Sequence, residues 1–347
     1  MIIINQQKKT IMKKVFFTLV AALMAATATY AQSSLVATLS HNGEISVFHG
    51  ATSLKQAMEA AENGDIITLA SGRYDAVDIT KAVTLRGAGM EEDSITGAFR
   101  TQIVGDFAIN IADSINEHLT MEGLYHESTI TMYGTLSNTM LQKCQFKSIN
   151  RSDDNNTVNS LTCIHCYITD HIGLPKNCSA NFISSVIQAP NNRLGGNMEF
   201  TNCVILFDFR YIFNSFFTNC FFYGWNDGWD SSYGGYNCCL NNTNMATYCA
   251  GCTRYKNPPF TNIPSSTNKT ISEKDFNALF KPNTFYVLTD EAKKEYIGND
   301  GTEIGIYGGN LPYNTRILSP QITKCNVAAK TTADGKLSVD IEVKAAE

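Results

Sequence analysis

Short units with the same order of polar and apolar positions recur along the middle of the chain. In each unit a small residue is followed two positions later by a large apolar one, and the residue just before the small one is polar. The pattern is clearest in "EFTNCVILF" (199–207) and "FFTNCFFYG" (216–224), where Thr-Asn-Cys returns after 17 residues. Side chains two apart on a strand share a face, so each unit predicts a short strand whose small and large residues face the core.

The units follow one another in steps of 21, 22, 19, 18, 17 and 18 residues, a spacing typical of a solenoid. Leucine-rich repeats need a leucine-asparagine consensus that is absent, whereas a parallel β-helix tolerates unequal rungs because loops can extend at any corner. We expect the small residues to stack as an interior ladder and their polar neighbours to face outward or to form bonds at a corner. The predicted ladder is Gly123, Cys144, Cys166, Ser185, Cys203, Cys220 and Cys238, with Tyr125, Phe146, Ile168, Ile187, Ile205, Phe222 and Leu240 two positions later.

An amphipathic helix is predicted near residues 53–63, before the repeats. Ser53 and Gln56 have the spacing of a capping box, and Gly64 suits the helix stop. Such a helix can cover the open end of a β-helix. Its apolar stripe is Leu54, Ala57, Met58 and Ala61, and strands are expected after it at 66–70, 77–79 and 83–85.

The segment "LKQAMEAAENGDIITLASGRY…ITKAVTLRGAG" resembles the opening of right-handed parallel β-helix proteins of the pectin-lyase-like superfamily. Together with "DGTEIGIYGGNLPY" (300–313), it makes residues 45–315 similar to exported β-helix proteins of Bacteroidetes-type bacteria. The resemblance implies an all-β, single-stranded right-handed parallel β-helix. It is weak evidence for activity, because this fold carries lyases, hydrolases, adhesins and uncharacterised members.

The two ends of the chain differ from the repeats. Residues 12–31, "MKKVFFTLVAALMAATATYA", have the basic start, short apolar run and small residues of a secretory signal peptide, so we expect cleavage after Ala31. The expected β-helix is then residues 32–315. Residues 316–347 predict a β-hairpin, because Leu337, Val339, Ile341 and Val343 alternate with polar residues after an Asp-Gly turn.

Charge narrows the range of partners. Removing residues 1–31 takes away four of the 27 basic residues and none of the 32 acidic ones, which leaves a net charge of −9. No basic cluster remains, so nucleic acid is not an expected partner. The mature chain has no segment apolar enough to cross a membrane. We expect a secreted, cell-surface or periplasmic protein of undetermined oligomeric state.

The segment "FFYGWNDGWDSSYGGYNCC" (221–239) is the leading ligand-site candidate, because it holds both tryptophans of the chain. Aromatic faces stack on sugar rings, and acidic or amide groups bind hydroxyls. The alternative is a loop folded onto the solenoid wall. The candidate ligand-binding residues are Trp225, Asp227, Trp229, Asp230 and Tyr233.

Two further groups could carry chemistry. Asp153-Asp154 could serve glycoside hydrolysis or bind calcium, or could be a solvated loop. Cys238, Cys239, Cys249 and Cys252 could form disulfides, pack reduced or bind a metal. No cofactor is expected, and calcium stays open.

No nucleophile elbow, phosphate loop or dinucleotide fingerprint is present. The sequence therefore favours an exported solenoid that binds a polysaccharide or a cell-surface glycan without catalysis. The alternatives are a polysaccharide lyase or glycoside hydrolase with a divergent site, and a purely structural surface protein or adhesin.

Overall fold

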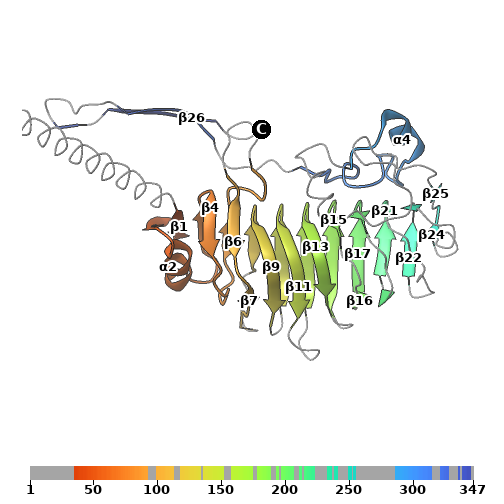
Figure 1. The fold of residues 1–347 in the computed structure, drawn as a ribbon, viewed down its shortest axis with the longest axis horizontal. Helices are drawn as coiled ribbons and strands as arrows, with labels where there is room; N and C mark the ends of the chain where they lie inside the picture. Colours follow the sequence, from red (N-terminus) through yellow and green to blue (C-terminus); the bar gives the residue numbers. More distant parts are fainter. Residues whose placement is uncertain are drawn as a thin grey trace, which may run out of the picture.

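The protein is an all-β parallel solenoid built of two long sheets (Figure 1). The computed structural model describes residues 35–92, 99–112, 118–133, 136–151, 158–174, 178–188, 193–194, 197–206, 211–212, 215–222, 233–236, 238–240, 249–251, 253–254, 286–314, 321–327, 335–336 and 338–344. The chain alternates between the sheets, so that each rung adds one parallel strand to each of them.

Twelve strands form the first sheet, which we name sheet A. All its neighbours are parallel except at the N-terminal end, where β1 is antiparallel to both β2 and β3. In spatial order its strands are β2 (Glu44–His49), β1 (Val36–His41), β3 (Ile66–Leu69), β5 (Thr84–Arg86), β8 (Thr120–Glu122), β10 (Leu136–Gln142), β12 (Val158–Ile164), β14 (Ser179–Ile183), β17 (Asn197–Thr201), β20 (Ser215–Thr218), β22 (Tyr233–Tyr236) and β24 (Cys249–Ala250).

Eleven strands form sheet B, which is parallel throughout. Its strands, from the C-terminal end, are β25 (Thr253–Arg254), β23 (Cys239–Leu240), β21 (Phe221–Phe222), β18 (Val204–Ile205), β15 (Val186–Ile187), β13 (Tyr167–Gly173), β11 (Gln145–Arg151), β9 (Tyr125–Met132), β6 (Thr101–Val104) and β4 (Gly72–Asp75), with β7 (Phe107–Ile109) also paired to β9. Separate pairs are β16 (Arg193–Leu194) with β19 (Tyr211–Ile212), and β26 (Gln321–Val327) with β27 (Val339–Lys344). The antiparallel pairing of β26 and β27 confirms the predicted hairpin.

In seven of the described rungs the chain turns from sheet A into sheet B through one residue with a positive φ. Only glycine adopts this conformation freely, and asparagine tolerates it better than most other residues. In the Thr-Asn-Cys triplets, threonine ends the strand of sheet A, asparagine makes the corner, and cysteine leads into sheet B. The corner residues are Gly123 (67°), Lys143 (50°), His165 (54°), Ser184 (43°), Asn202 (53°), Asn219 (52°) and Gly251 (69°).

The residue after each corner points into the solenoid, as the ladder predicts. The Cys203 thiol donates to the Phe182 carbonyl of the preceding rung at 3.2 Å, and Cys220 does the same to Phe200 at 3.3 Å. The cysteine side chains that the structure describes are all buried thiols outside any disulfide, and burial raises the pKa of the Cys220 thiol. These thiols are small core residues that also bond backbone carbonyls at the corner.

The predicted ladder is wrong by one position in its first rung. Gln145 pairs with Tyr125 on one side and with Tyr167 on the other, so Gly123 is the corner residue and Leu124 takes the ladder position. Leu124 is fully buried in the core, whereas Tyr125 lies on the outer face. Glycine suits both a small ladder position and a left-handed corner, and its positive φ decides for the corner.

Helix α2 (Ser53–Ala60) lies at the N-terminal end of the solenoid and buries Leu54, Ala57 and Met58 against it (Figure 1). The predicted capping box is wrong: Thr52 is the N-cap, no side chain caps it, and Ser53 is buried in the first turn. The helix is instead capped at its C-terminal end. The Lys81 ammonium donates to the carbonyls of Met58, Glu59 and Ala61 at 2.6–2.9 Å.

The strands after the helix agree only in part with the sequence prediction. Strands β3 and β5 confirm the predicted strands at 66–70 and 83–85. The segment 77–79 forms no strand and contributes one isolated bridge, from Ile79 to Ile109. Strand β4 begins at Gly72, where the sequence suggests a turn.

Phenylalanines stack directly on one another in the core. The Phe182 and Phe200 rings are 4.8 Å apart at 9°, and those of Phe200 and Phe217 are 4.7 Å apart at 11°. These separations match the strand spacing of a sheet, so each rung contributes one ring to the stack. The residue before Phe217 on β20, Phe216, points the other way and is 47% exposed.

We predict that Phe217→Ala lowers the free energy of unfolding by about 3–5 kcal/mol, because it leaves a cavity inside the ring stack. Its neighbour supplies the control: Phe216→Ala removes an exposed ring and should change stability by about 0.5 kcal/mol or less. Urea unfolding followed by circular dichroism measures both. Equal losses would contradict the assignment of faces.

Candidate functional site

Residues 286–314 cover the corner and the outer face of sheet B; we call this segment the strap. It contains helix α4 (Asp290–Glu295), whose N-cap Thr289 accepts a hydrogen bond from the Ala292 amide. Figure 1 shows the strap and α4 along one edge of the solenoid. The strap also explains why sheet B is apolar outside as well as inside.

A second apolar cluster joins the strap to sheet B. The Tyr296 ring meets the Phe221 ring edge-on at 6.2 Å, and the Tyr313 ring meets His165 at 5.6 Å. Burying these aromatic groups is the main attraction that holds the strap. The cluster comprises Met90, Tyr125, Tyr167, Val186, Val204, Leu206, Phe221, Tyr286, Leu288, Ala292, Tyr296, Ile304, Ile306 and Tyr313.

Polar corner side chains determine the position of the strap. The Asn219 amide donates to Asn299 Oδ1 at 2.7 Å, and its oxygen accepts from the Asn299 backbone amide at 3.1 Å. One rung earlier, Asn202 donates to the Gly305 carbonyl at 3.4 Å. One rung earlier again, the Ser184 hydroxyl donates to the Leu311 carbonyl at 2.6 Å. Three successive corners therefore bind three points of the strap.

Two glycines let the strap approach the asparagines closely. A Cβ at Gly298 would lie 2.9 Å from the Asn219 amide group, and one at Gly309 would lie 2.8 Å from Asn202 Oδ1. Gly309 also has a φ of +77°, which disfavours any side chain there. The glycine content of the strap follows from this contact.

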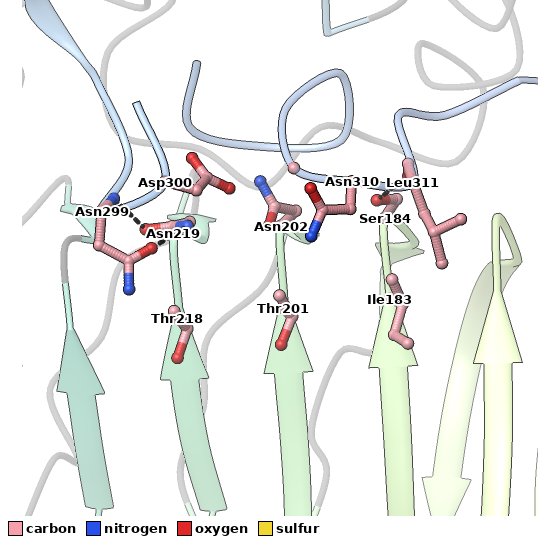
Figure 2. Close-up of a pocket in the computed structure, with 11 residues that line it drawn as sticks. Ile183, Ser184, Thr201, Asn202, Thr218, Asn219, Asn299, Asp300, Asn310 and Leu311 are labelled. Carbon is pink, nitrogen blue, oxygen red and sulfur yellow. Dashed lines mark hydrogen bonds between the residues drawn. The ribbon is translucent and has the colours of Figure 1, made fainter. Parts of the chain in front are cut away.

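A pocket of about 350 Å³ lies between the strap and the last residues of β14, β17 and β20 (Figure 2). This volume is within the range of small-molecule sites. The solenoid contributes Ile183, Ser184, Thr201, Asn202, Thr218 and Asn219, and the strap contributes Asn299, Asp300, Gly309, Asn310 and Leu311. Figure 2 shows Thr218 and Thr201 side by side on neighbouring strands, with Asn219 and Asn202 above them.

Some of these polar groups are satisfied within the protein and others are not. Asn219 and Ser184 are bound to the strap, and Asp300 accepts from the amide and the hydroxyl of Thr302. By contrast, the hydroxyls of Thr201 and Thr218 and the Asn310 amide have no hydrogen-bond partner within the described part of the chain. The pocket thus offers hydroxyl and amide groups to a ligand.

The charge of the pocket is slight and negative. Asp300 is its one carboxylate, and no arginine or lysine belongs to the lining found among the described residues. In that part of the chain, no group of three histidine, cysteine or acidic residues could hold a metal ion. The pocket therefore presents neutral hydrogen-bonding groups rather than a charged or metal-binding centre.

Beside the pocket, His165 is a buried neutral corner residue. Its Nε2 donates to the Leu311 carbonyl at 3.1 Å, while its Nδ1 is buried without a partner. Burial lowers the pKa of His165, the bond to Leu311 opposes this, and the nearby Lys143 ammonium lowers it further. Protonation would add a buried N–H with no acceptor.

None of the sequence-predicted ligand residues belongs to the lining found among the described residues. Trp225, Asp227, Trp229 and Asp230 are outside the described residues, and of Tyr233 only the backbone, the start of β22, is described. Their segment joins the end of β21 to the start of β22. It therefore connects to sheet A at the opposite end of the strands from the pocket.

Asp153 and Asp154 also lie outside the described residues, between β11 and β12. Their segment enters sheet A at the same edge as the tryptophan segment. Strands β12 and β22 are four strand positions apart, about 19 Å at normal strand spacing. The two segments thus lead into the first residues of two strands of sheet A that are well apart.

Of the four clustered cysteines, Cys238 is a buried thiol outside any disulfide. Cys239 begins β23 and Cys249 begins β24, and their side chains, like the whole of Cys252, lie outside the described set. The pairing of these three stays a prediction. No helix in the described part of the chain is long and apolar enough to cross a bilayer.

No protein-family model matches this chain, and neither a curated protein nor a solved structure is significantly similar to it. The site must therefore be judged on its own geometry.

The sequence did not predict the pocket, but it did predict the role of two of its residues, Asn202 and Asn219. The asparagines before the ladder were expected to face outward or bond at a corner, and they do so. The strap residues 299–311 could not be assigned to them, because the contacts join positions 80–127 residues apart. The only signal was the glycine-rich composition of "DGTEIGIYGGN".

We predict that Asn219→Gly loosens the strap, because it deletes two side-chain bonds while keeping the left-handed corner. These bonds stabilise by about 1–3 kcal/mol together, so amide exchange at 298–305 should be about tenfold faster. Asn219→Ala should destabilise more, since alanine also strains the corner. Unchanged exchange in both variants would show that the asparagine does not hold the strap.

We also predict a pH effect from His165. The pKa of His165 in the fold lies below the unfolded value of about 6.5. The stability that depends on neutral His165 is therefore complete above about pH 6.5 and is lost as the pH falls from there through the folded pKa. His165→Asn keeps a corner-compatible residue and should flatten the fall in melting temperature between pH 7.5 and 5.5. The same fall in wild type and variant would assign it to other groups.

Proposed function

We propose that this protein is an exported solenoid that binds a carbohydrate in the corner pocket without transforming it. The observation that carries the proposal is a pocket of about 350 Å³ in which two threonine hydroxyls and the Asn310 amide are open to solvent and have no partner among the described residues. Sugars present many hydroxyls, and each can donate to and accept from such groups.

The same observation argues against catalysis at this pocket. Glycoside hydrolysis usually needs two carboxyl groups flanking the scissile bond. In the described lining Asp300 is the only carboxylate, and its Oδ1 accepts two bonds from Thr302. A binding role therefore requires fewer assumptions than a lyase or hydrolase role.

Export and kinship belong to the same proposal. The signal-peptide pattern of residues 12–31 supports secretion to the periplasm, the cell surface or the medium. A parallel solenoid with a helical N-terminal cap supports a distant relation to the pectin-lyase-like β-helix proteins. A polysaccharide or cell-surface glycan is the partner that suits this location.

The test is a glycan array probed with the chain lacking residues 1–31, followed by calorimetry on the strongest ligand. We predict that the double variant Thr201→Val, Thr218→Val weakens binding about tenfold, because it removes two hydrogen bonds and keeps the side-chain shape. Thr68→Val is the matched control and should bind normally, because Thr68 on β3 lies in the same cross-strand row of sheet A as Thr201 and Thr218 but far from the pocket.

Binding that the double variant leaves unchanged would place the ligand elsewhere, and the segment of Trp225 and Trp229 would be tested next. The same glycans are also assayed for new reducing ends. Their release would contradict the non-catalytic part of the proposal, and an array without any binding would contradict the carbohydrate part.

A further inference from the structure

The pocket opens beside a stretch of sheet A that no described segment covers. Strand pairing places Asn181, Glu199 and Phe216 in one row across β14, β17 and β20. This row lies two residues before Ile183, Thr201 and Thr218, on the same outer face and about 7 Å along the strands. The pocket and the row are therefore parts of one continuous surface.

Phe216 is the feature of this surface that demands an explanation. Its ring is 47% exposed, although the other phenylalanines of β20 and β21 are fully buried. A single exposed apolar residue is ordinary, but this one adjoins a pocket with unsatisfied hydroxyl groups. An aromatic face next to convergent polar groups has the composition of a sugar-binding platform.

We propose that the bound glycan continues out of the pocket onto Phe216, and that it is a neutral glycan rather than a uronate. The inference rests on the proposed function and adds an extended subsite and a ligand class to it. One sugar unit occupies the pocket near Thr201 and Thr218, and the next stacks on the Phe216 ring. The glycan then lies along the strand direction, from the corner toward the middle of the sheet.

Charge selects the class of glycan. Glu199 is the cross-strand neighbour of Phe216, is exposed, and makes no ion pair with a described residue. Asp300 lies at the other end of the surface, in the pocket. The nearest basic corner residue, Lys143, is buried two rungs before Ser184. Among the described residues of this surface, a uronate carboxylate would meet two like charges and no accessible cation, whereas a neutral sugar uses the carboxylates as acceptors.

The experiment compares neutral and uronate oligosaccharides of increasing length by calorimetry. Neutral oligosaccharides should bind wild type at least tenfold more tightly than uronates of equal length. Phe216→Ala should weaken the longer neutral ligands about tenfold and leave the monosaccharide unchanged, and Phe216→Trp should restore or exceed wild-type affinity. Glu199→Gln should raise uronate affinity a few-fold.

Val104→Ala is the control, because Val104 is a similarly exposed apolar residue on sheet B and should not affect binding. Thermal melting checks that each variant is folded. If Phe216→Ala binds long ligands like wild type while Thr201→Val, Thr218→Val does not, the extended subsite is wrong and the pocket stands. Equal or tighter binding of uronates overturns the ligand class. If both Phe216→Ala and the double threonine variant bind like wild type, the proposed function itself is overturned.

Discussion

From Gly123 to Asn219 the solenoid turns from sheet A into sheet B at a single residue, and a positive φ at that residue makes so sharp a change feasible. The corner places the following side chain inside, within reach of backbone carbonyls near the ends of the strands. A thiol or hydroxyl meets those carbonyls, as Cys203 and Cys220 do at 3.2 and 3.3 Å. The corner side chain itself must point outward, so the same geometry that builds the core also creates a polar line along the surface.

These polar corner side chains can be buried only because another segment covers them and bonds to them. Asn202 and Asn219 are each about 2% exposed, and amides so deeply buried are costly unless they are bonded. The strap supplies the partners and, with its aromatic residues, covers the apolar outer face of sheet B. No described segment covers sheet A in this way over β14, β17 and β20, and the pocket lies at the boundary between the covered surface and this one.

The parts of this architecture that depend on local alternation could be predicted from the sequence. Cysteine and the residue two later share a face on any strand, so the core positions from Cys144 to Phe222 were predictable without knowledge of the corners. Gly123 was assigned to the wrong position because a glycine fits two roles that only the backbone dihedral distinguishes. The capping box at Ser53 failed because burial of that serine outweighed its capping preference.

The pocket belongs to another class of feature. Its two walls lie about a hundred residues apart in sequence, and nothing local in Asn299 or Asn310 indicates which rung each will meet. Aromatic residues attracted attention to the Trp225 segment because composition is visible in a sequence. Unsatisfied hydroxyls are visible only after the fold has paired every other group.

The strap meets successive corners in order along its length. Asn299 bonds the corner at Asn219, Gly305 bonds those at Asn219 and Asn202, and Leu311 bonds those at Ser184 and His165. Solenoids usually gain or lose whole repeats with little penalty, because each repeat contacts only its neighbours. Here a rung inserted or deleted between Ser184 and Asn219 would put the strap out of step with the solenoid. Over this stretch the contacts with the strap fix the number of rungs. Rungs can be gained or lost without this constraint only outside it.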